Sequence, residues 1–213
     1  VNGPGPLLSD ATQNHLISTL THHAQSADWV ALAGSLPKGV DAGWYTDLIK
    51  EIRTAAPQAR IAVDTSDAPM KAIAKQLATA APDLIKPNGF ELGQLTGQDG
   101  LALERAAAAG DYSPVVEAAR DVVGRGIKEV LVTLGGAGAV LVNADGAWAA
   151  TPPPATVKST VGAGDAALAG YLLGRTQGHG PADSLALSVA YGTAAAAKPG
   201  TQFPRPEELD TAH

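Results

Sequence analysis

One short stretch of the sequence combines a glycine-containing loop with a carboxylate. Thr160-Val161-Gly162-Ala163-Gly164-Asp165 runs straight into an apolar segment that predicts a helix over 163–176. A loop without bulky side chains at a helix start presents unpaired backbone N–H groups and the positive end of the helix dipole to an anion. In phosphoryl transfer, such N–H groups would stabilise the moving group while Asp165 accepts the proton of the attacking hydroxyl. The alternative is a plain tight turn in which Asp165 only belongs to the first helical turn.

Asn88 and Glu91 form a second pattern with possible chemistry. They lie three residues apart, so at a helix start their side chains project from one face. Oxygen donors of this kind suit Mg²⁺, either directly or through its water molecules. The alternative is a helix cap in which Glu91 reaches back to the first residue, as in a capping box.

The segment Thr133–Gly138 holds three glycines, which would let backbone approach a nucleotide closely. It lacks the Lys-Ser/Thr pair of a Walker A loop and contains no G-x-G-x-x-G, which argues against a P-loop NTPase or a dinucleotide oxidoreductase. The alternative is a simple strand-to-strand turn. Lys158, just before the anion loop, could reach a phosphate, although a solvated lysine is the more common case.

The elements that must position these motifs alternate along the chain. Apolar runs at 28–33, 60–64, 83–86 and 129–133 predict strands, and the segments at about 10–25, 41–56, 67–81 and 113–125 predict helices. Short strands separated by amphipathic helices are typical of a parallel sheet with right-handed crossovers. A hairpin is then expected from 139–142 and 147–149, followed by helices over 163–176 and 181–197. No linker is apparent, so we expect a single domain over 1–213.

Each of the four strand candidates is followed by a polar motif. These motifs begin at Gly34, Asp64, Lys86 and Thr133. Open α/β sheets bind ligands at the carboxyl ends of their strands, so a binding cleft is expected there.

Composition excludes several classes of function. The formal net charge of −6 gives no electrostatic footprint for nucleic acid, and the absence of cysteine excludes disulfides and thiolate chemistry. No apolar run is long enough to cross a bilayer, and Val1-Asn2-Gly3-Pro4 has no signal-peptide pattern. We therefore expect a cytoplasmic protein without membrane or nucleic-acid partners.

Taken in order, the motifs resemble the ribokinase-like, or PfkB, family of carbohydrate kinases. The resemblance rests on Asn88-x-x-Glu91, Thr133-x-Gly135-x-x-Gly138 and Gly162-Ala163-Gly164-Asp165. The resemblance is greatest for the subgroup of bacterial 1-phosphofructokinases and tagatose-6-phosphate kinases. Short sequence motifs of that subgroup are similar to residues 2–6, 34–39, 64–66 and 86–88 of this chain. The match covers essentially the whole chain.

The resemblance implies a role for each matched position. Asp165 would be the catalytic base, and Gly162, Ala163 and Gly164 would form the anion hole. Asn88 and Glu91 would organise Mg²⁺ and its water molecules. The ATP site would be lined by Thr133, Gly135 and Gly138, with Lys158 near phosphate. The segment from Ser188 to Lys198 would pack by the adenine. Ser35 and Lys38 would lie near the sugar phosphate.

The resemblance also implies the fold and the reaction. The expected fold is a three-layer α/β/α, Rossmann-like arrangement with a mostly parallel sheet, without the family's amino-terminal strands and lid. The expected reaction is ATP-dependent phosphorylation of a ketohexose phosphate, with fructose 1-phosphate going to fructose 1,6-bisphosphate as the first choice. Tagatose 6-phosphate or another sugar is the alternative substrate, and an inactive nucleotide-binding fragment is the alternative from another class. We expect the full-length form of the protein to be a homodimer.

Overall fold

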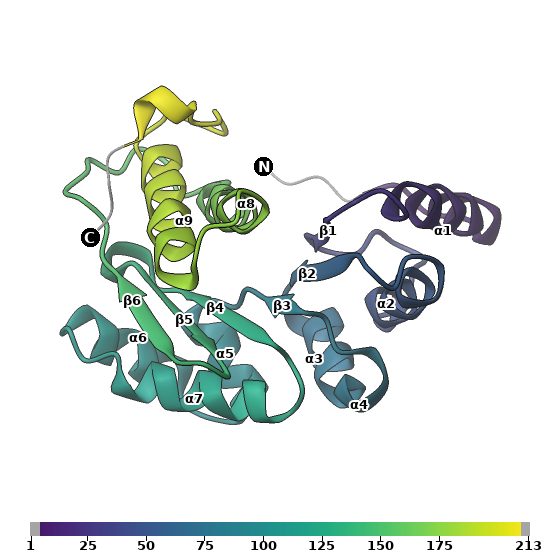
Figure 1. Cartoon of the computed structure of the whole chain (residues 1–213), viewed down its shortest axis with the longest axis horizontal. Coiled ribbons are helices and arrows are strands. Elements are labelled where there is room, and N and C mark those ends of the chain that lie inside the picture. Colours follow the sequence, from purple (N-terminus) through teal and green to yellow (C-terminus); the bar gives the residue numbers. More distant parts are fainter. Residues whose placement is uncertain (1–4, 210–213) are drawn as a thin grey trace. The chain divides into compact units, whose positions relative to one another are not determined.

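The computed structural model describes residues 5–209, and these belong to two compact units (Figure 1). One unit contains the chain up to Ile85 together with 124–128, and the other contains 86–123 and the chain from Glu129 onward. Asn2, Gly3 and Pro4, which open one of the family-like strings, lie outside the described residues. The single domain expected over 1–213 stays a prediction.

The first unit has a parallel sheet whose strands follow one another in chain order. They are β1 (Trp29–Ala33), β2 (Arg60–Asp64) and β3 (Leu84–Ile85), and Ala62 lies opposite both Ala31 and Leu84. The helices of this unit are α1 (Asp10–Ala24), α2 (Trp44–Ala55), α3 (Asp67–Lys75) and α4 (Leu77–Ala80). The predicted alternation of parallel strands and helices is confirmed here. The single helix expected over 67–81 is interrupted at Gln76, whose φ of −119° is not helical.

A stripe on α2 builds the core of this unit. Tyr45, Leu48, Ile49 and Ile52 follow helical spacing and are buried, with Ile49 and Ile52 at 0% exposure. They are joined by the fully buried Ile61 of β2. The helix packs its apolar face inward and leaves its polar face to solvent, as its sequence pattern predicts.

A buried carboxylate ties three segments of the first unit together. Asp83 is 3% exposed, and its two oxygens lie 2.8 Å from Arg53 Nη2 and 2.8 Å from Lys128 Nζ. The backbone N–H of Ile61 also donates to it, at 2.8 Å. Burial alone would raise the pKa of Asp83, but the hydrogen bonds from Lys128, Ile61 and Arg53 outweigh burial and hold its pKa below the usual 3.8.

The depressed pKa of Asp83 predicts acid sensitivity. A carboxyl whose pKa is lower in the folded state stabilises the fold above its unfolded pKa and loses that contribution as pH falls through the folded pKa. We expect Asp83→Asn to lower the free energy of unfolding by about 1–3 kcal/mol at pH 7 and to flatten its decline below pH 4. Urea unfolding at several pH values measures this. Asp47→Asn is the control, because its pair with Lys50 is exposed and should contribute little; parallel pH curves for wild type and Asp83→Asn would contradict the assignment.

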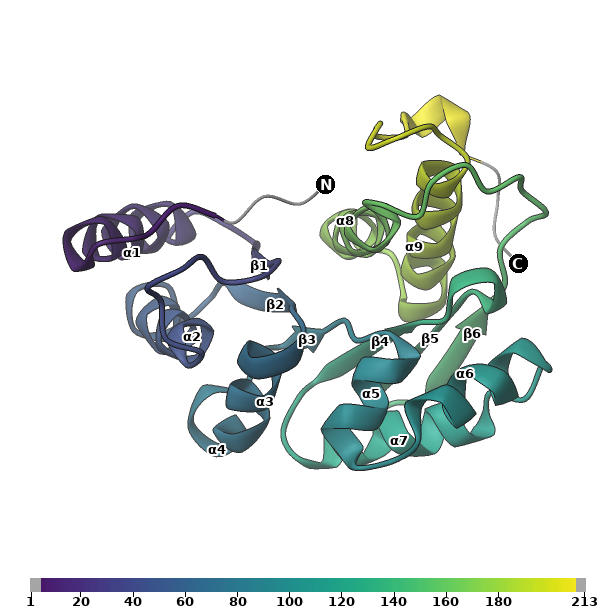
Figure 2. The ribbon, with the colours of Figure 1, turned by 180° about the vertical axis from the view of Figure 1, so that it is seen from behind.

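The second unit has a three-stranded antiparallel sheet. Its strands are β4 (Glu129–Thr133), β5 (Ala139–Asn143) and β6 (Ala147–Ala150). Its helices are α5 (Gly89–Thr96), α6 (Gly100–Ala108), α7 (Ser113–Gly124), α8 (Ala163–Thr176) and α9 (Pro181–Ala196). Figures 1 and 2 show α8 and α9 on one face of these strands and α5, α6 and α7 on the other, which makes three layers. The predicted hairpin is confirmed, and β4 joins it as an antiparallel neighbour.

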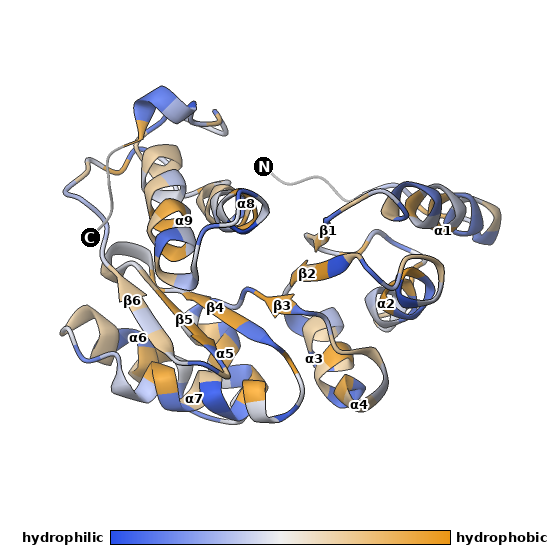
Figure 3. Ribbon diagram, in the orientation of Figure 1, coloured by the Kyte–Doolittle hydropathy of each residue, from blue (hydrophilic) through white to orange (hydrophobic). Residues whose placement is uncertain are grey.

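The centre of the second unit is the apolar pair β4 and β5, which Figure 3 colours mostly orange. Val130, Leu131 and Val132 of β4 are all at 0% exposure, so the strand is covered on both faces. At its start, Glu129 accepts a hydrogen bond from Tyr171 at 3.0 Å and pairs with Arg175 at 3.1 Å. These bonds join β4 to α8. Within residues 5–209, no helix combines the length and apolar character needed to span a membrane.

Candidate functional site

The loop Gly162–Asp165 opens α8 as the sequence predicts. Gly162 has a φ of 80°, a left-handed conformation that glycine adopts without strain, and it is the residue that precedes the helix. Among the described residues no side chain caps this end of α8. The Ala163 N–H donates to the Thr160 carbonyl at 3.3 Å, which leaves the N–H groups of Gly164 and Asp165 as the ones that could face an anion. Asp165 lies in this turn and is exposed. The geometry suits the predicted anion loop, and the catalytic roles of Gly162, Ala163, Gly164 and Asp165 stay predictions.

A lysine to which we assigned no role lies beside this helix start. Lys86, directly after β3, is only 5% exposed, and a methyl group added at Gly164 would lie 3.2 Å from its Nζ. The uncapped helix end and the buried ammonium therefore bring positive potential to one place. A buried lysine after an apolar strand was the available signal for this residue.

The glycine segment after β4 forms the turn between β4 and β5, with a short 3₁₀ helix over Gly135–Ala137. The strand-to-strand alternative is therefore correct as a description of the connection. Gly138 has a φ of 87°, and a Cβ there would overlap the carbonyl oxygen of Ala150. The backbone thus approaches β6 more closely than any side chain would permit.

The contact at Gly138 gives a prediction with a built-in control. Gly138→Ala should lower the free energy of unfolding by about 1–3 kcal/mol or more, because alanine there would add left-handed backbone strain as well as steric overlap. Gly136→Ala should change it by less than about 0.5 kcal/mol, because nothing lies within 4 Å of a Cβ at that position. Thermal or urea unfolding of the two variants makes the comparison. Equal effects would show that the contact at Gly138 is relaxed in solution.

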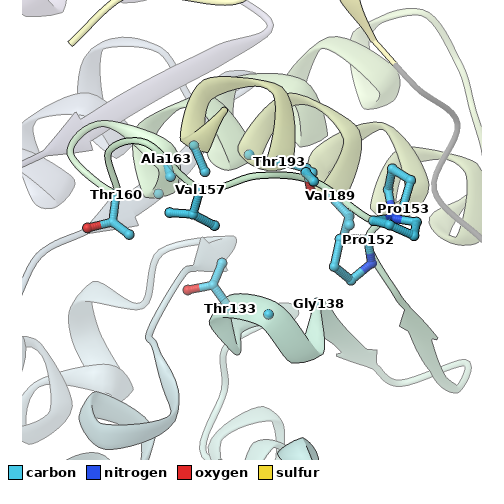
Figure 4. A pocket seen from close by; sticks show the side chains of 16 residues that line it. Thr133, Gly138, Pro152, Pro153, Val157, Thr160, Ala163, Val189 and Thr193 are labelled. Carbon is cyan, nitrogen blue, oxygen red and sulfur yellow. The ribbon is translucent and has the colours of Figure 1, made fainter. Parts of the chain in front are cut away.

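A cavity of about 510 Å³ lies between this glycine segment and α9. Figure 4 shows Thr133 and Thr160 toward one end, and Pro152, Pro153 and Val189 toward the other. The wall is mostly apolar and also contains Gly135, Gly136, Gly138, Pro154, Ala155, Val157, Ala163, Gly164, Gly192, Thr193 and Ala196. Its volume lies within the range of small-molecule sites, and one end reaches the start of α8. The cavity can hold a flat apolar group at one end and an anion at the other.

Asn88 and Glu91 form a reciprocal capping box at the start of α5. The Asn88 N–H donates to Glu91 Oε2 at 2.8 Å, and the Glu91 N–H donates to Asn88 Oδ1 at 2.7 Å. The capping alternative is therefore confirmed. Neither residue lines the cavity, but Asn88 lies beside Thr133, which does. Asn88 forms a parallel bridge with Thr133, and the Thr133 N–H donates to Pro87 at 3.0 Å. Within 5–209 no three or more acidic or histidine side chains gather to hold a metal, so the magnesium role stays a prediction that needs water or phosphate oxygens as further ligands.

Two residues expected near the nucleotide, Ser188 and Lys158, do not line this cavity, and their contact with nucleotide stays a prediction. Ser188 is fully buried, and its hydroxyl donates to Ala167 of α8 at 2.8 Å, so it joins the two helices rather than lining the cavity. Its neighbour Val189 lines the cavity instead. Lys158 is exposed, and its backbone N–H donates to Ala196 at 2.8 Å. Of the segment around Lys158, Val157 and Thr160 contribute to the wall.

The predicted sugar-phosphate residues belong to the first unit. Ser35 and Lys38 are exposed and follow β1 at its carboxyl end. The turn that carries them is fixed at Gly34, whose carbonyl accepts hydrogen bonds from Tyr45 at 3.0 Å and Thr65 at 2.9 Å. Ser35 and Lys38 thus extend from a defined turn, and their contact with substrate stays a prediction.

Comparison with known proteins decides the family. The model of the pfkB family carbohydrate kinases matches residues 3–208. The chain belongs to the pfkB family of carbohydrate kinases. Among curated pfkB relatives, the 1-phosphofructokinase of Rhodobacter capsulatus is 40% identical over 210 residues, which are 98% of this chain and 62% of that protein. The 1-phosphofructokinase of Escherichia coli K12 is 36% identical over 163 residues, which are 76% of this chain and 47% of that protein.

Solved pfkB-type structures confirm the α/β fold. Phosphofructokinase-2 from Escherichia coli, in complex with potassium, matches with a TM-score of 0.80 and 28% identity, covering 97% of this chain and 62% of that one. A possible 1-phosphofructokinase from Thermotoga maritima matches with a TM-score of 0.75 at 20% identity, which bears on the fold alone. The chain spans less than two thirds of the length of these relatives.

Proposed function

We propose that the protein transfers the γ-phosphoryl group of ATP to a hydroxyl of a ketohexose phosphate, with fructose 1-phosphate as the substrate and fructose 1,6-bisphosphate as the product. The observation that carries the proposal is the uncapped start of α8, with the Lys86 ammonium beside it, at the edge of a 510 Å³ cavity. Both curated relatives named above are 1-phosphofructokinases, which favours fructose 1-phosphate over tagatose 6-phosphate, the second candidate.

The two ends of the cavity suit different parts of ATP, the adenine and the phosphates. The adenine would lie against Pro152, Pro153 and Val189, and the phosphates would point toward Thr133 and Thr160. There the N–H groups of the α8 start and the Lys86 ammonium would stabilise negative charge as it moves to the acceptor. Such groups stabilise developing charge best when they are already in place before substrate binds, because they then need little reorganisation during the reaction.

Asp165 would accept the proton of the attacking sugar hydroxyl. It lies in the first turn of α8, next to the N–H groups that would hold the phosphoryl group. A carboxylate within hydrogen-bond reach of both acceptor and phosphoryl group is what general-base catalysis requires. The sugar phosphate would be held by the turn that carries Ser35 and Lys38. A chain of the relatives' full length is proposed to act as a homodimer.

The test is ADP release with a panel of sugar phosphates. A chain of the relatives' full length should release ADP with fructose 1-phosphate faster than with tagatose 6-phosphate, and the product should carry a second phosphate. Preference for tagatose 6-phosphate would select the second candidate. ATP binding without phosphoryl transfer to any sugar would identify a nucleotide-binding protein without kinase activity.

Glu91 is proposed to orient water molecules on Mg²⁺ while it caps α5. Glu91→Gln keeps an oxygen that can accept the Asn88 N–H but removes the charge, so we expect little loss of stability. The Mg²⁺ concentration for half-maximal rate should rise by about 10-fold, as for other groups that orient a metal's ligands. A Mg²⁺ titration beside a thermal melt measures both. Glu117→Gln on the exposed face of α7 is the control, and an unchanged Mg²⁺ requirement for Glu91→Gln would leave Glu91 with the capping role alone.

A further inference from the structure

A tyrosine from outside the glycine segment forms a hydrogen bond to the middle of it. Tyr112, just before α7, donates its hydroxyl to the carbonyl oxygen of Ala137 at 2.7 Å. The other bonds of this turn are internal: the Leu134 N–H donates to Gly138, and the Gly138 N–H donates to Gly135. The pairing of Thr133 with Ala139 fixes the two ends of the turn, and the Tyr112 bond adds a contact at Ala137, nearer its middle.

Packing gives the segment little further support. Gly136 lines the 510 Å³ cavity on one side and a second hollow of about 610 Å³ on the other. Nothing lies within 4 Å of a Cβ built at Gly135 or Gly136. Gly138, at the end of the segment, lies close to Ala150, but Gly135 and Gly136 have open space where a side chain would pack and gain little contact energy there. The Tyr112 bond therefore contributes more to its position than one hydrogen bond usually does.

We infer that Tyr112 is a positioning residue for ATP: its hydroxyl holds the Gly135–Gly138 segment at the distance from α9 that the nucleotide needs. This inference rests on the proposed function of the cavity. Tyr112 approaches the segment from the second hollow, which its ring lines together with Leu134 and Ala137. It acts on the nucleotide only through the backbone of Ala137.

Tyr112→Phe tests the inference, because it removes the hydroxyl and keeps the ring. ATP binding by calorimetry should weaken by about 3- to 10-fold, on the scale of one net hydrogen bond. Amide hydrogen exchange at Ala137 and Gly138 should accelerate, while the unfolding temperature stays close to that of wild type. The matched control is Tyr45→Phe in the first unit, whose hydroxyl likewise donates to backbone carbonyls, those of Ala33 and Gly34. It should leave ATP affinity and exchange in the glycine segment unchanged.

The two readouts separate failure of the inference from failure of the proposed function. If wild type binds ATP and Tyr112→Phe binds it equally well, Tyr112 does not position the nucleotide, and the proposed function stands. If exchange at Ala137 and Gly138 is unchanged in Tyr112→Phe, the bond does not hold the segment, whatever ATP does. If wild type binds no ATP, the proposed function fails, and the positioning role fails with it.

Discussion

Replacing Asp165 with asparagine is expected to lower kcat by about 10²–10⁴-fold, the usual contribution of a general base. Asparagine keeps the shape of the side chain but cannot take up the proton of the attacking hydroxyl. The N–H groups at the start of α8 remain, so ATP binding should be nearly intact and the loss should appear in kcat more than in KM. The measurement is steady-state kinetics with ATP and fructose 1-phosphate in a chain of the relatives' full length.

Asp183→Asn is the matched control for the alternative role of Asp165. Asp183 also lies in the first turn of a helix, α9, and is exposed. If Asp165 only complements the helix dipole, both substitutions should cost about 0.3–1 kcal/mol of stability and leave turnover alone. Turnover of Asp165→Asn within a few-fold of wild type would contradict its assignment as the base.

Lys86→Met is expected to lower kcat by about 10²–10³-fold, the range for removing one preorganised charge-stabilising donor. Methionine fills a similar volume without the ammonium beside Gly164. Because Lys86 is only 5% exposed, a thermal melt beside the kinetics is needed to separate an effect on turnover from an effect on stability. A loss of turnover without a loss of stability would identify a functional lysine, since functional sites often retain groups that stability alone would not favour.

Lys158→Met provides the comparison for Lys86. Lys158 is the lysine that the sequence suggests for phosphate contact, but it is exposed and its side chain does not line the cavity. We expect its replacement to change kcat little. If Lys158→Met proved the more damaging substitution, Lys158 rather than Lys86 would serve the phosphates.

The regular elements were the most predictable part of the structure. The runs at 60–64 and 129–133 are apolar, rich in β-branched residues and flanked by turns, and they form β2 and β4 with those bounds. The helix over 163–176 likewise has the predicted bounds. In each case the local pattern and the tertiary environment favour the same structure, so the sequence alone is sufficient.

The sequence analysis expected a helix start at Asn88 but gave no bounds for α5 and did not predict α6, because their glycines weaken the local signal. Gly93 and Gly100 lower helix propensity, yet a Cβ on Gly93 would lie only 2.5 Å from the backbone nitrogen of Gly100. The two helices need these glycines in order to pack closely. That requirement comes from tertiary contact, which no local pattern reveals.

The orientation of α9 also could not be predicted from the sequence. Small and apolar residues surround this helix, so its periodicity does not show which face meets the cavity. Val189, Thr193 and Ala196 form the stripe that lines it, and Ser188 faces α8 instead. The role of Lys86 was not predicted either: its place directly after an apolar strand was visible in the sequence, but its burial comes from tertiary packing.

The central claim is that ATP binds between the glycine segment and the start of α8, and amide hydrogen exchange with and without ATP tests it most directly. The account predicts slower exchange in two separate stretches, Gly135–Gly138 and Ala163–Asp165, at ATP concentrations that saturate binding. Exchange along α1 and α4 should stay the same. Unchanged exchange in both stretches at saturating ATP, or protection confined to other parts of the chain, would contradict the account.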